Sequence, residues 1–265
     1  MSFPENGEHG MQKRKRVNVL GIEIDPISLG EAVLLIAAWI EKKTLSYVNF
    51  CTVNTIMECF GNRKLKHALK GGLTAPDGMP LVWLCRYYGH RDAVRVYGPD
   101  FMLAFCKYSE GKGYQHFFYG GAPGIAEDLA DELKRRFPNI EIAGTHAPPF
   151  RKIGDMEVSS VIESINASGA DIIWVGLGTP KQDLWIAQHR HLLKAPVLAA
   201  VGAAFDFHTG RSPQAPYWMQ RSGLEWLFRL INEPRRLAFR YLVYNPIFIL
   251  LVILQLTGLR KYHTF

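Results

Sequence analysis

The chain has 265 residues, of which 48% are hydrophobic and 21% charged, so it can bury a large core as one domain or as one domain with an appendage. The formal net charge of +7 favours an anionic partner: nucleic acid, anionic lipid or a phosphorylated substrate. The four cysteines (Cys51, Cys59, Cys85 and Cys106) lie far apart with no CxxC pair, which predicts buried free thiols in a reducing cytoplasm and disfavours a metal site.

The N-terminal segment carries charge but no apolar stretch of signal-peptide length, so we do not expect secretion. We expect residues 1–16 to form a flexible basic tail, with a membrane-surface contact through residues 13–16 as the alternative. Residues 17–24 alternate like a strand or hairpin. Ser28 is placed to cap an amphipathic helix over 29–42.

Strand and helix patterns then alternate along the chain. Strands are expected at 46–53, 116–119, 140–145, 172–175 and 197–201, and helices at 54–60, 65–73, 81–88, 101–111, 125–137, 158–168 and from 181 onward. Residues 74–80 are expected to form a compact loop. This alternation predicts an α/β catalytic domain over 17–210, with an open, mostly parallel, Rossmann-like sheet and helices on both faces.

The composition shifts near Gly210, and residues 211–265 are expected to form a helical membrane-association appendage. Its first part mixes aromatic residues with arginines: Arg211, Arg221, Arg229, Arg235, Arg236 and Arg240. Residues 241–259 carry no charge, a length that just reaches across a bilayer. Asn245-Pro246 should interrupt this run and Gln255 lies late in it, so we expect monotopic attachment. A spanning helix and a soluble core or oligomer helix are the alternatives.

Glycine-bearing loops follow several predicted strands. Their candidate ligand-binding residues are Gly120, Gly121, Gly144, Gly176, Gly178 and Lys181. In an open parallel sheet the loops at the carboxyl ends of the strands converge on one crevice, and the N-terminus of a helix there favours a diphosphate. Glycines that merely end strands are the alternative.

Three charged residues lie in loops near that predicted edge. Asp77 stands between a proline and a glycine, which suits a fixed general base, although Asp-Gly also occurs as an ordinary turn. Arg95 could pair with a diphosphate or form a surface ion pair. Asp206 ends an apolar stretch at the same edge.

Several motifs taken together, in order over residues 17–240, resemble the WecG/TagA/CpsF glycosyltransferases (glycosyltransferase family 26). They are Thr52-Val53-Asn54, Ala75-Pro76-Asp77-Gly78, Arg95-Val96-Tyr97-Gly98, Gly176-Leu177-Gly178-Thr179-Pro180-Lys181-Gln182-Asp183-Leu184-Trp185, Gly202–Asp206, Gly223-Leu224-Glu225-Trp226 and Glu233-Pro234-Arg235-Arg236. The family pattern has Glu at the position of Asp183. The resemblance implies a bacterial inverting enzyme that transfers a sugar from a UDP-sugar to a monosaccharide on undecaprenyl diphosphate, at the cytoplasmic face of the inner membrane.

The resemblance also implies residue roles. Asp77 would be the base, Arg95 an active-site arginine, and Thr52, Asn54 and Gln182 would line the crevice. The appendage arginines, Arg229 and Arg236 among them, would close the site. Because the chain has no Asp-x-Asp motif, we expect no metal and no cofactor, with the charge of departing UDP met by arginines and backbone N–H groups.

The donor and the functional class have alternatives. We favour a hexose from UDP-glucose, used in exopolysaccharide or cell-surface polysaccharide synthesis, over UDP-N-acetylmannosamine or its uronic acid. A nucleotide-binding oxidoreductase or hydrolase on a similar sheet is another alternative, but a hydride-transfer enzyme would need a tighter dinucleotide loop with an acidic ribose partner, which the sequence does not show. A non-enzymatic nucleotide- or membrane-binding protein stays open, as does a homo-oligomer. We expect no nucleic-acid partner, because the arginines adjoin an uncharged run.

Overall fold

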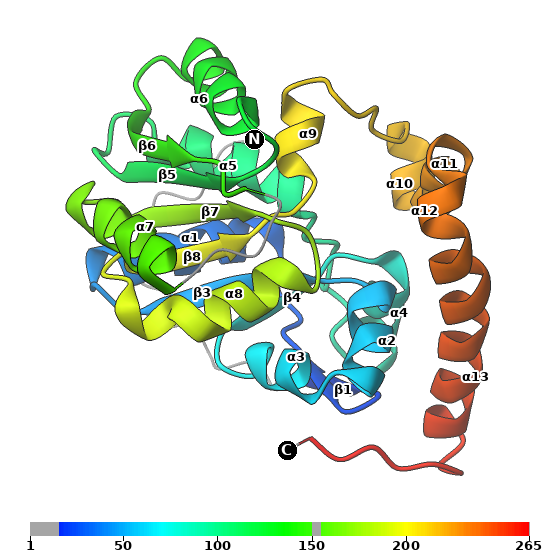
Figure 1. The fold of residues 1–265 in the computed structure, drawn as a ribbon. Helices are drawn as coiled ribbons and strands as arrows, with labels where there is room; N and C mark the ends of the chain where they lie inside the picture. The colour runs from blue at the N-terminus through cyan, green and yellow to red at the C-terminus, as the bar shows by residue number, and fades with distance from the viewer. Residues whose placement is uncertain (1–15, 150–154, 265) are drawn as a thin grey trace.

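A six-stranded parallel sheet forms the centre of the computed structural model, which describes residues 16–149 and 155–264 (Figure 1). Apart from Arg16, the predicted basic tail lies outside the described residues. In spatial order the strands are β4 (Leu73–Pro76), β3 (Ser46–Cys51), β8 (Val197–Ala200), β7 (Ile172–Gly176), β5 (Gln115–Gly120) and β6 (Glu141–His146). The predicted open parallel sheet is confirmed.

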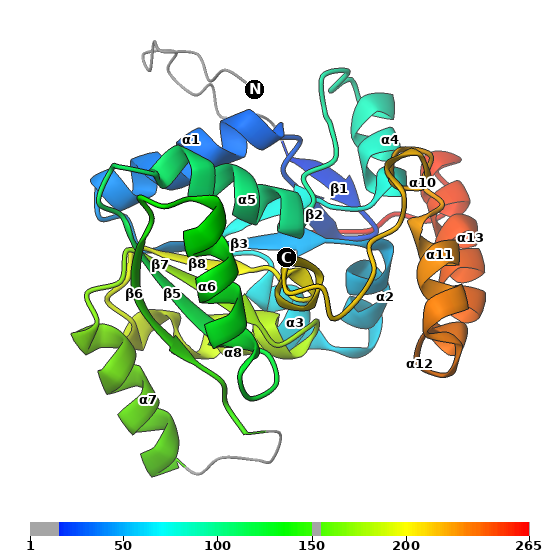
Figure 2. The ribbon, with the colours of Figure 1, turned by 90° about the horizontal axis from the view of Figure 1, so that it is seen from above.

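Helices cover both faces of this sheet (Figure 2). In chain order they are α1 (Leu29–Glu41), α2 (Val53–Gly61), α3 (Arg63–Ala68), α4 (Met79–Tyr87), α5 (Gly98–Ser109), α6 (Ile125–Arg136), α7 (Asp155–Ala167), α8 (Lys181–His189) and α9 (Ala204–His208). Strand side chains alternate between the faces: Val48 packs on the side of α1 and α5, whereas Tyr47 packs on the side of α7 and α8. Ser28 caps α1 in a capping box, as expected.

The chain differs from the expectation at β4, since residues 73–76 were assigned to the end of a helix and to a loop. They form instead the edge strand of the sheet, paired only with β3. Four residues are too few to show a strand period, and Pro76 argues against a central strand. An edge strand tolerates this proline, because its missing N–H is not needed by a second neighbour.

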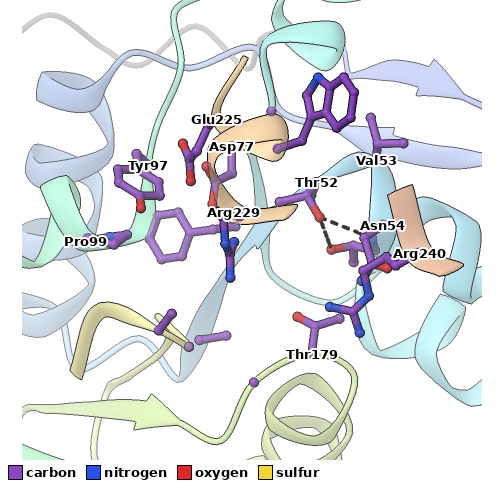
Figure 3. Close-up of a pocket in the computed structure, with 18 of the residues that line it drawn as sticks. Thr52, Val53, Asn54, Asp77, Tyr97, Pro99, Thr179, Glu225, Arg229 and Arg240 are labelled. Carbon is purple, nitrogen blue, oxygen red and sulfur yellow. Dashed lines mark hydrogen bonds between the residues drawn. The ribbon is translucent and has the colours of Figure 1, made fainter. Parts of the chain in front are cut away.

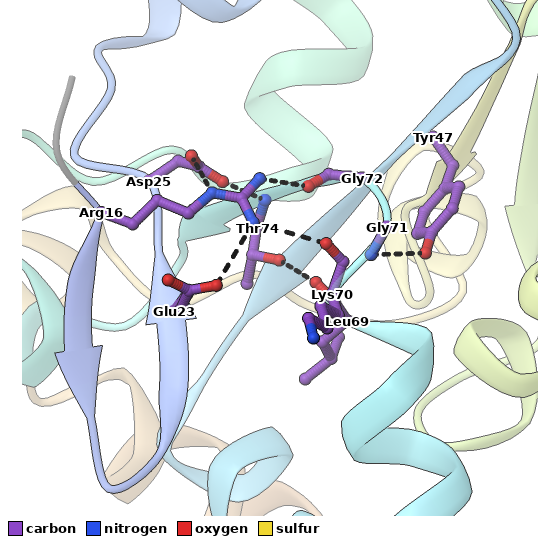
Figure 4. Close-up of polar contacts among 9 residues, drawn as sticks. All are labelled: Arg16, Glu23, Asp25, Tyr47, Leu69, Lys70, Gly71, Gly72 and Thr74. Carbon is purple, nitrogen blue, oxygen red and sulfur yellow. Dashed lines mark hydrogen bonds and ion pairs between the residues drawn. The ribbon is translucent and has the colours of Figure 1, made fainter. Parts of the chain in front are cut away.

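A small hairpin, β1 (Val17–Val19) and β2 (Ile22–Ile24), is fastened to the start of β4 (Figure 4). Arg16 Nε donates to Asp25 Oδ1 at 2.8 Å, and an Arg16 terminal nitrogen donates to the Gly72 carbonyl at 2.7 Å. The backbone N–H of Thr74 donates to the other Asp25 oxygen at 2.8 Å. The hairpin thus fixes the edge strand that leads directly to Asp77.

The C-terminal helices form a column beside α2 and α4 (Figures 1 and 2). They are α10 (Tyr217–Arg221), α11 (Glu225–Asn232), α12 (Pro234–Phe239), a π-helical turn (Arg240–Tyr244) and α13 (Asn245–Leu256). The expected interruption at Asn245-Pro246 was wrong. The π turn lies directly before the proline, and its wider i→i+5 bonding accommodates a residue that has no N–H.

The apolar run is therefore one continuous helix over Leu237–Leu256. It is long and apolar enough to cross a membrane, with a mean hydropathy of 2.0 in a window of which 11% is buried. The helix nevertheless lies against the body of the protein. Phe248 is buried with the hairpin and α2, and Gln255 Oε1 accepts from the Leu20 N–H at 2.8 Å while its Nε2 donates to the Asn18 carbonyl at 2.7 Å.

Candidate active site

A cavity of about 1520 Å³ lies between the carboxyl ends of the strands and the C-terminal helices. Residues that follow five different strands line it: Thr52 after β3, Asp77 after β4, Gly121 after β5, Gly178 after β7 and Gly202 after β8. Three of the loops expected to converge at one sheet edge, those after β3, β5 and β7, line this cavity together. The fourth, expected at residues 144–146, does not, because these residues belong to β6.

Most of the candidate residues line this cavity. They are Thr52, Asn54, Asp77, Arg95, Gly121, Gly176, Gly178, Lys181, Gln182, Asp206 and Arg229. Gly120 and Gly144 are not among the lining residues. A Cβ atom on Gly120 would lie 2.5 Å from the Gly176 carbonyl oxygen, and one on Gly144 would lie 2.8 Å from the ring of Phe117. These two glycines thus permit close packing within the sheet. Arg236 falls on α12, and its side chain is outside the described part of the chain.

Asp77, Arg95 and Glu225 form an ion-pair chain at one side of the cavity. Figure 3 shows the two carboxylate side chains, Asp77 and Glu225, close to each other. The same terminal nitrogen of Arg95 lies 3.0 Å from Asp77 Oδ1 and 2.6 Å from Glu225 Oε2. Arg95 Nε also donates to the Asp77 carbonyl, and the guanidinium stacks 4.0 Å from the centre of the Tyr97 ring. Arg95 is therefore held from several sides and connects the strand-end loop to α11.

The carboxyl group of Asp77 has a higher pKa than an ordinary aspartate. Burial raises its pKa to about 6, with the attraction of Arg95 opposing this rise and the nearby charge of Glu225 adding to it. Only 9% of the residue is exposed. A carboxylate with a pKa near 6 is ionised at neutral pH and is a stronger proton acceptor than an ordinary aspartate.

Thr52 and Asn54 stand where β3 passes into α2. Thr52 caps this helix, its Oγ1 accepting from the Thr55 N–H at 3.2 Å. Asn54 Oδ1 is buried and has no hydrogen-bond partner among the described residues, although Asn54 lines the cavity. Because buried polar atoms are normally paired, this oxygen is a natural acceptor for a ligand donor.

Two arginines enter the cavity from the C-terminal helices, opposite the strand-end loops (Figure 3). Arg229 comes from α11 and Arg240 from the π turn, and both line the same cavity as Asn54 and Thr179. Arg240 is one of the appendage arginines that the family resemblance places over the site, although it was not selected as a binding residue. Two guanidinium groups facing a glycine-bearing loop suit a diphosphate, which accepts paired N–H donors.

Gln182 has a supporting position. Its Nε2 donates to the Ala200 carbonyl at 2.9 Å, and its Oε1 accepts from the Gly178 N–H at 2.9 Å. Both ends of the amide are thus occupied by the protein. Gln182 fastens the glycine-bearing loop to the end of β8 and so sets the shape of the cavity wall.

Asp183, where the family pattern has Glu, is buried, and burial raises its pKa to about 6. All four cysteines are free and buried, as expected. Among residues 16–149 and 155–264, no group of three or more His, Cys, Asp or Glu side chains is arranged to hold a metal ion. Glu225 was not selected from the sequence, and its only signal was its place in the motif over 223–226.

Comparison with known proteins identifies the family of the chain. The family model described as "Glycosyl transferase WecG/TagA/CpsF family" matches residues 17–262. The N-acetylglucosaminyldiphosphoundecaprenol N-acetyl-beta-D-mannosaminyltransferase of Bacillus spizizenii is 33% identical over 161 residues, 61% of each chain. The Staphylococcus aureus enzyme of the same name is 24% identical over 226 residues, 84% of this chain and 87% of the relative. The match thus spans less than two thirds of the Bacillus relative. The chain belongs to the WecG/TagA/CpsF glycosyltransferase family.

Proposed function

We propose that this glycosyltransferase moves a sugar from a UDP-sugar to a saccharide carried by undecaprenyl diphosphate, with inversion at the anomeric carbon. The observation that carries the proposal is the buried carboxyl of Asp77, with a pKa of about 6, in a cavity that also holds Arg95, Arg229 and Arg240. One base and several cations are what a single displacement with an anionic leaving group requires.

The names of the relatives favour one acceptor and one donor sugar. They name N-acetylglucosaminyl diphosphoundecaprenol as the acceptor and N-acetylmannosamine as the transferred sugar. We therefore propose UDP-N-acetylmannosamine as the donor, in place of the UDP-glucose that the sequence first suggested. The beta linkage in these names agrees with inversion of an alpha-linked UDP-sugar.

In the proposed reaction, the Asp77 carboxylate takes the proton of the acceptor hydroxyl. The oxygen of that hydroxyl attacks the anomeric carbon of the donor at the same time. The bond between that carbon and the UDP oxygen breaks, and UDP leaves with the electron pair. Arg229, Arg240 and the N–H groups at the start of α8 would stabilise the developing negative charge.

The pH dependence follows from the need for an ionised Asp77. We expect kcat/KM to fall about tenfold per pH unit below about pH 6, because only the deprotonated carboxylate accepts the proton. Glu225→Gln removes a negative charge that raises the pKa of Asp77, so the acidic limb should move to lower pH. Glu163→Gln, on the exposed surface of α7, is the matched control. An acidic limb that stays in place in Glu225→Gln would contradict this coupling.

Chelation tests how the leaving group is stabilised. Arginine side chains line the cavity, and the sequence has no Asp-x-Asp motif to hold a metal ion. We therefore expect turnover in excess EDTA to equal turnover without EDTA. Loss of activity in EDTA that Mg²⁺ or Mn²⁺ restores would show that the arginines do not suffice.

The proposed function is tested by UDP release from purified protein, with a short-chain lipid diphosphate carrying N-acetylglucosamine as acceptor. We expect release from UDP-N-acetylmannosamine to depend on the acceptor and to exceed release from UDP-glucose. Release without acceptor would indicate a hydrolase, and no release from any UDP-sugar would contradict the proposal.

We also propose that the protein works at the cytoplasmic face of the bacterial inner membrane. An undecaprenyl acceptor is held in the bilayer, and the continuous apolar helix Leu237–Leu256 offers a surface for contact with it.

A further inference from the structure

The cavity has an apolar part that the sugar-transfer chemistry does not use. One of its walls is α4, where Met79, Trp83 and Tyr87 line the cavity at four-residue spacing and so share one face of the helix. The turn at Gly223 lies against this wall, because a Cβ atom there would come 3.2 Å from the indole of Trp83.

The opposite wall is α13. Ile249, Ile253 and Leu256 line the cavity at spacings of four and three, which again places them on one helix face. The two walls are joined at the end of α13, where Gln255 Nε2 lies 3.2 Å from the hydroxyl of Tyr88. Between the two walls lies an apolar channel, defined here by Met79, Trp83, Tyr87, Ile249, Ile253 and Leu256 and open to solvent along its length, with Trp83 50% and Ile249 58% exposed.

This channel is continuous with the polar part of the cavity. Asp77 and Arg240 lie at the polar end. At the other end Tyr87 is 67% exposed, Ile253 51% and Leu256 37%. From Asn245 to Leu256 the axis of α13 rises about 16 Å. An amphipathic molecule with an anionic head and a long hydrocarbon tail fits this sequence of environments.

We propose that the apolar channel between α4 and α13 binds the part of the acceptor's polyprenyl chain next to its diphosphate. This inference rests on the proposed function, which supplies a lipid diphosphate acceptor. The other substrate, a nucleotide sugar, has no hydrocarbon to bury here. The channel would align the acceptor sugar with Asp77 by holding the lipid on the far side of the diphosphate.

The channel is distinct from the surface of α13 that would meet a bilayer. Ile247 and Leu250 do not line the cavity and are 40% and 56% exposed. At about 100° per residue, Ile247 lies about 150° and Leu250 about 90° around the helix from the mean direction of Ile249, Ile253 and Leu256, so neither shares the face that lines the channel. The two apolar surfaces can therefore be changed separately.

The test compares two soluble acceptors with the same sugar diphosphate, one on a farnesyl chain and one on an ethyl group, without membranes or micelles. We expect a KM at least about tenfold lower for the farnesyl acceptor, since burial of a short hydrocarbon segment suffices for that difference. Ile253→Asn and Trp83→Gln, on opposite walls, should each remove most of this advantage. The KM for the ethyl acceptor and for the donor should stay the same. Leu250→Asn, on the outward side, is the matched control.

A binding measurement separates this inference from the proposed function. Calorimetry with farnesyl diphosphate and inorganic diphosphate should show tighter binding of the former, and the two channel variants should lose the difference. Equal KM values for both acceptors in an active wild-type enzyme would overturn the channel and leave the transfer reaction standing. Selective binding of farnesyl diphosphate without any transfer would overturn the reaction but not the apolar site. Equal rises of both KM values in the variants would indicate structural damage and would also count against the channel.

Discussion

Replacing Asp77 by asparagine is expected to lower kcat by about 10²- to 10⁴-fold, the usual loss when a positioned general base is removed. An amide keeps the shape of the side chain, and its oxygen can still accept from Arg95, which lies 3.0 Å from Asp77 Oδ1. It cannot take a proton from the acceptor. The arginine also keeps its ion pair with Glu225. The loss should therefore fall on the chemical step and not on the fold.

Three measurements define this result. Turnover should drop while UDP affinity, measured by calorimetry, stays near that of the wild type. The thermal midpoint, measured at pH 6 where about half of the Asp77 carboxyl groups are protonated, should change little, because the amide oxygen keeps the contact with Arg95. Asp92→Asn, in the loop between α4 and α5, is the control for a lost surface charge. Near-normal turnover in Asp77→Asn would remove Asp77 from the proposed role.

The sequence predicted the parts of the fold that depend on local pattern. Alternating strands and helices gave the parallel sheet, and strand ends gave the positions of Thr52, Asn54 and Asp77 at one edge. It missed β4, whose four residues show no period and end in a proline. The sequence alone does not show that these residues pair with β3 at the edge of the sheet, and this pairing is what makes them a strand.

Contacts between distant segments could not be predicted in this way. Arg95 joins Asp77 to Glu225, which is far from both in the sequence, and no local pattern marks Glu225 as its partner. Arg240 follows an arginine-rich helix, where a bilayer-facing role and a cavity-facing role look alike in sequence. Gly120 shows the same ambiguity, because glycine allows a strand to approach a neighbouring backbone as readily as a ligand.

Gln255 shows how a single polar residue acquires its meaning from the fold. In sequence it counted against a membrane span, as an amide late in an uncharged run. In the structure its amide bonds to both the Leu20 N–H and the Asn18 carbonyl of the hairpin. A spanning helix would have to break these contacts, so we expect a helix that lies along the body and meets the membrane with its outer side.

The outer side of this helix should control membrane binding. Leu242, Ile247 and Leu250 are 64%, 40% and 56% exposed, and none of them lines the cavity. Burying each in a bilayer should contribute about 1 kcal/mol, so replacing all three by asparagine should weaken partitioning into liposomes about 100-fold or more. Flotation with anionic liposomes measures this. Met156→Asn, on α7 and 90% exposed, is the matched control.

The same experiment separates a surface helix from a spanning one. If the helix lies on the membrane surface, alkaline carbonate should release the full-length protein from the membrane. The triple variant should float poorly but keep its turnover of a soluble acceptor, because the face of α13 that lines the cavity is unchanged. A spanning helix would resist carbonate, and three asparagines would not free it selectively. Deleting residues from Tyr241 onward should abolish flotation but also lower activity on soluble acceptor, since it removes Ile249, Ile253 and Leu256 from the cavity wall. Equal flotation of the wild type and the triple variant would show that α13 does not carry the membrane contact.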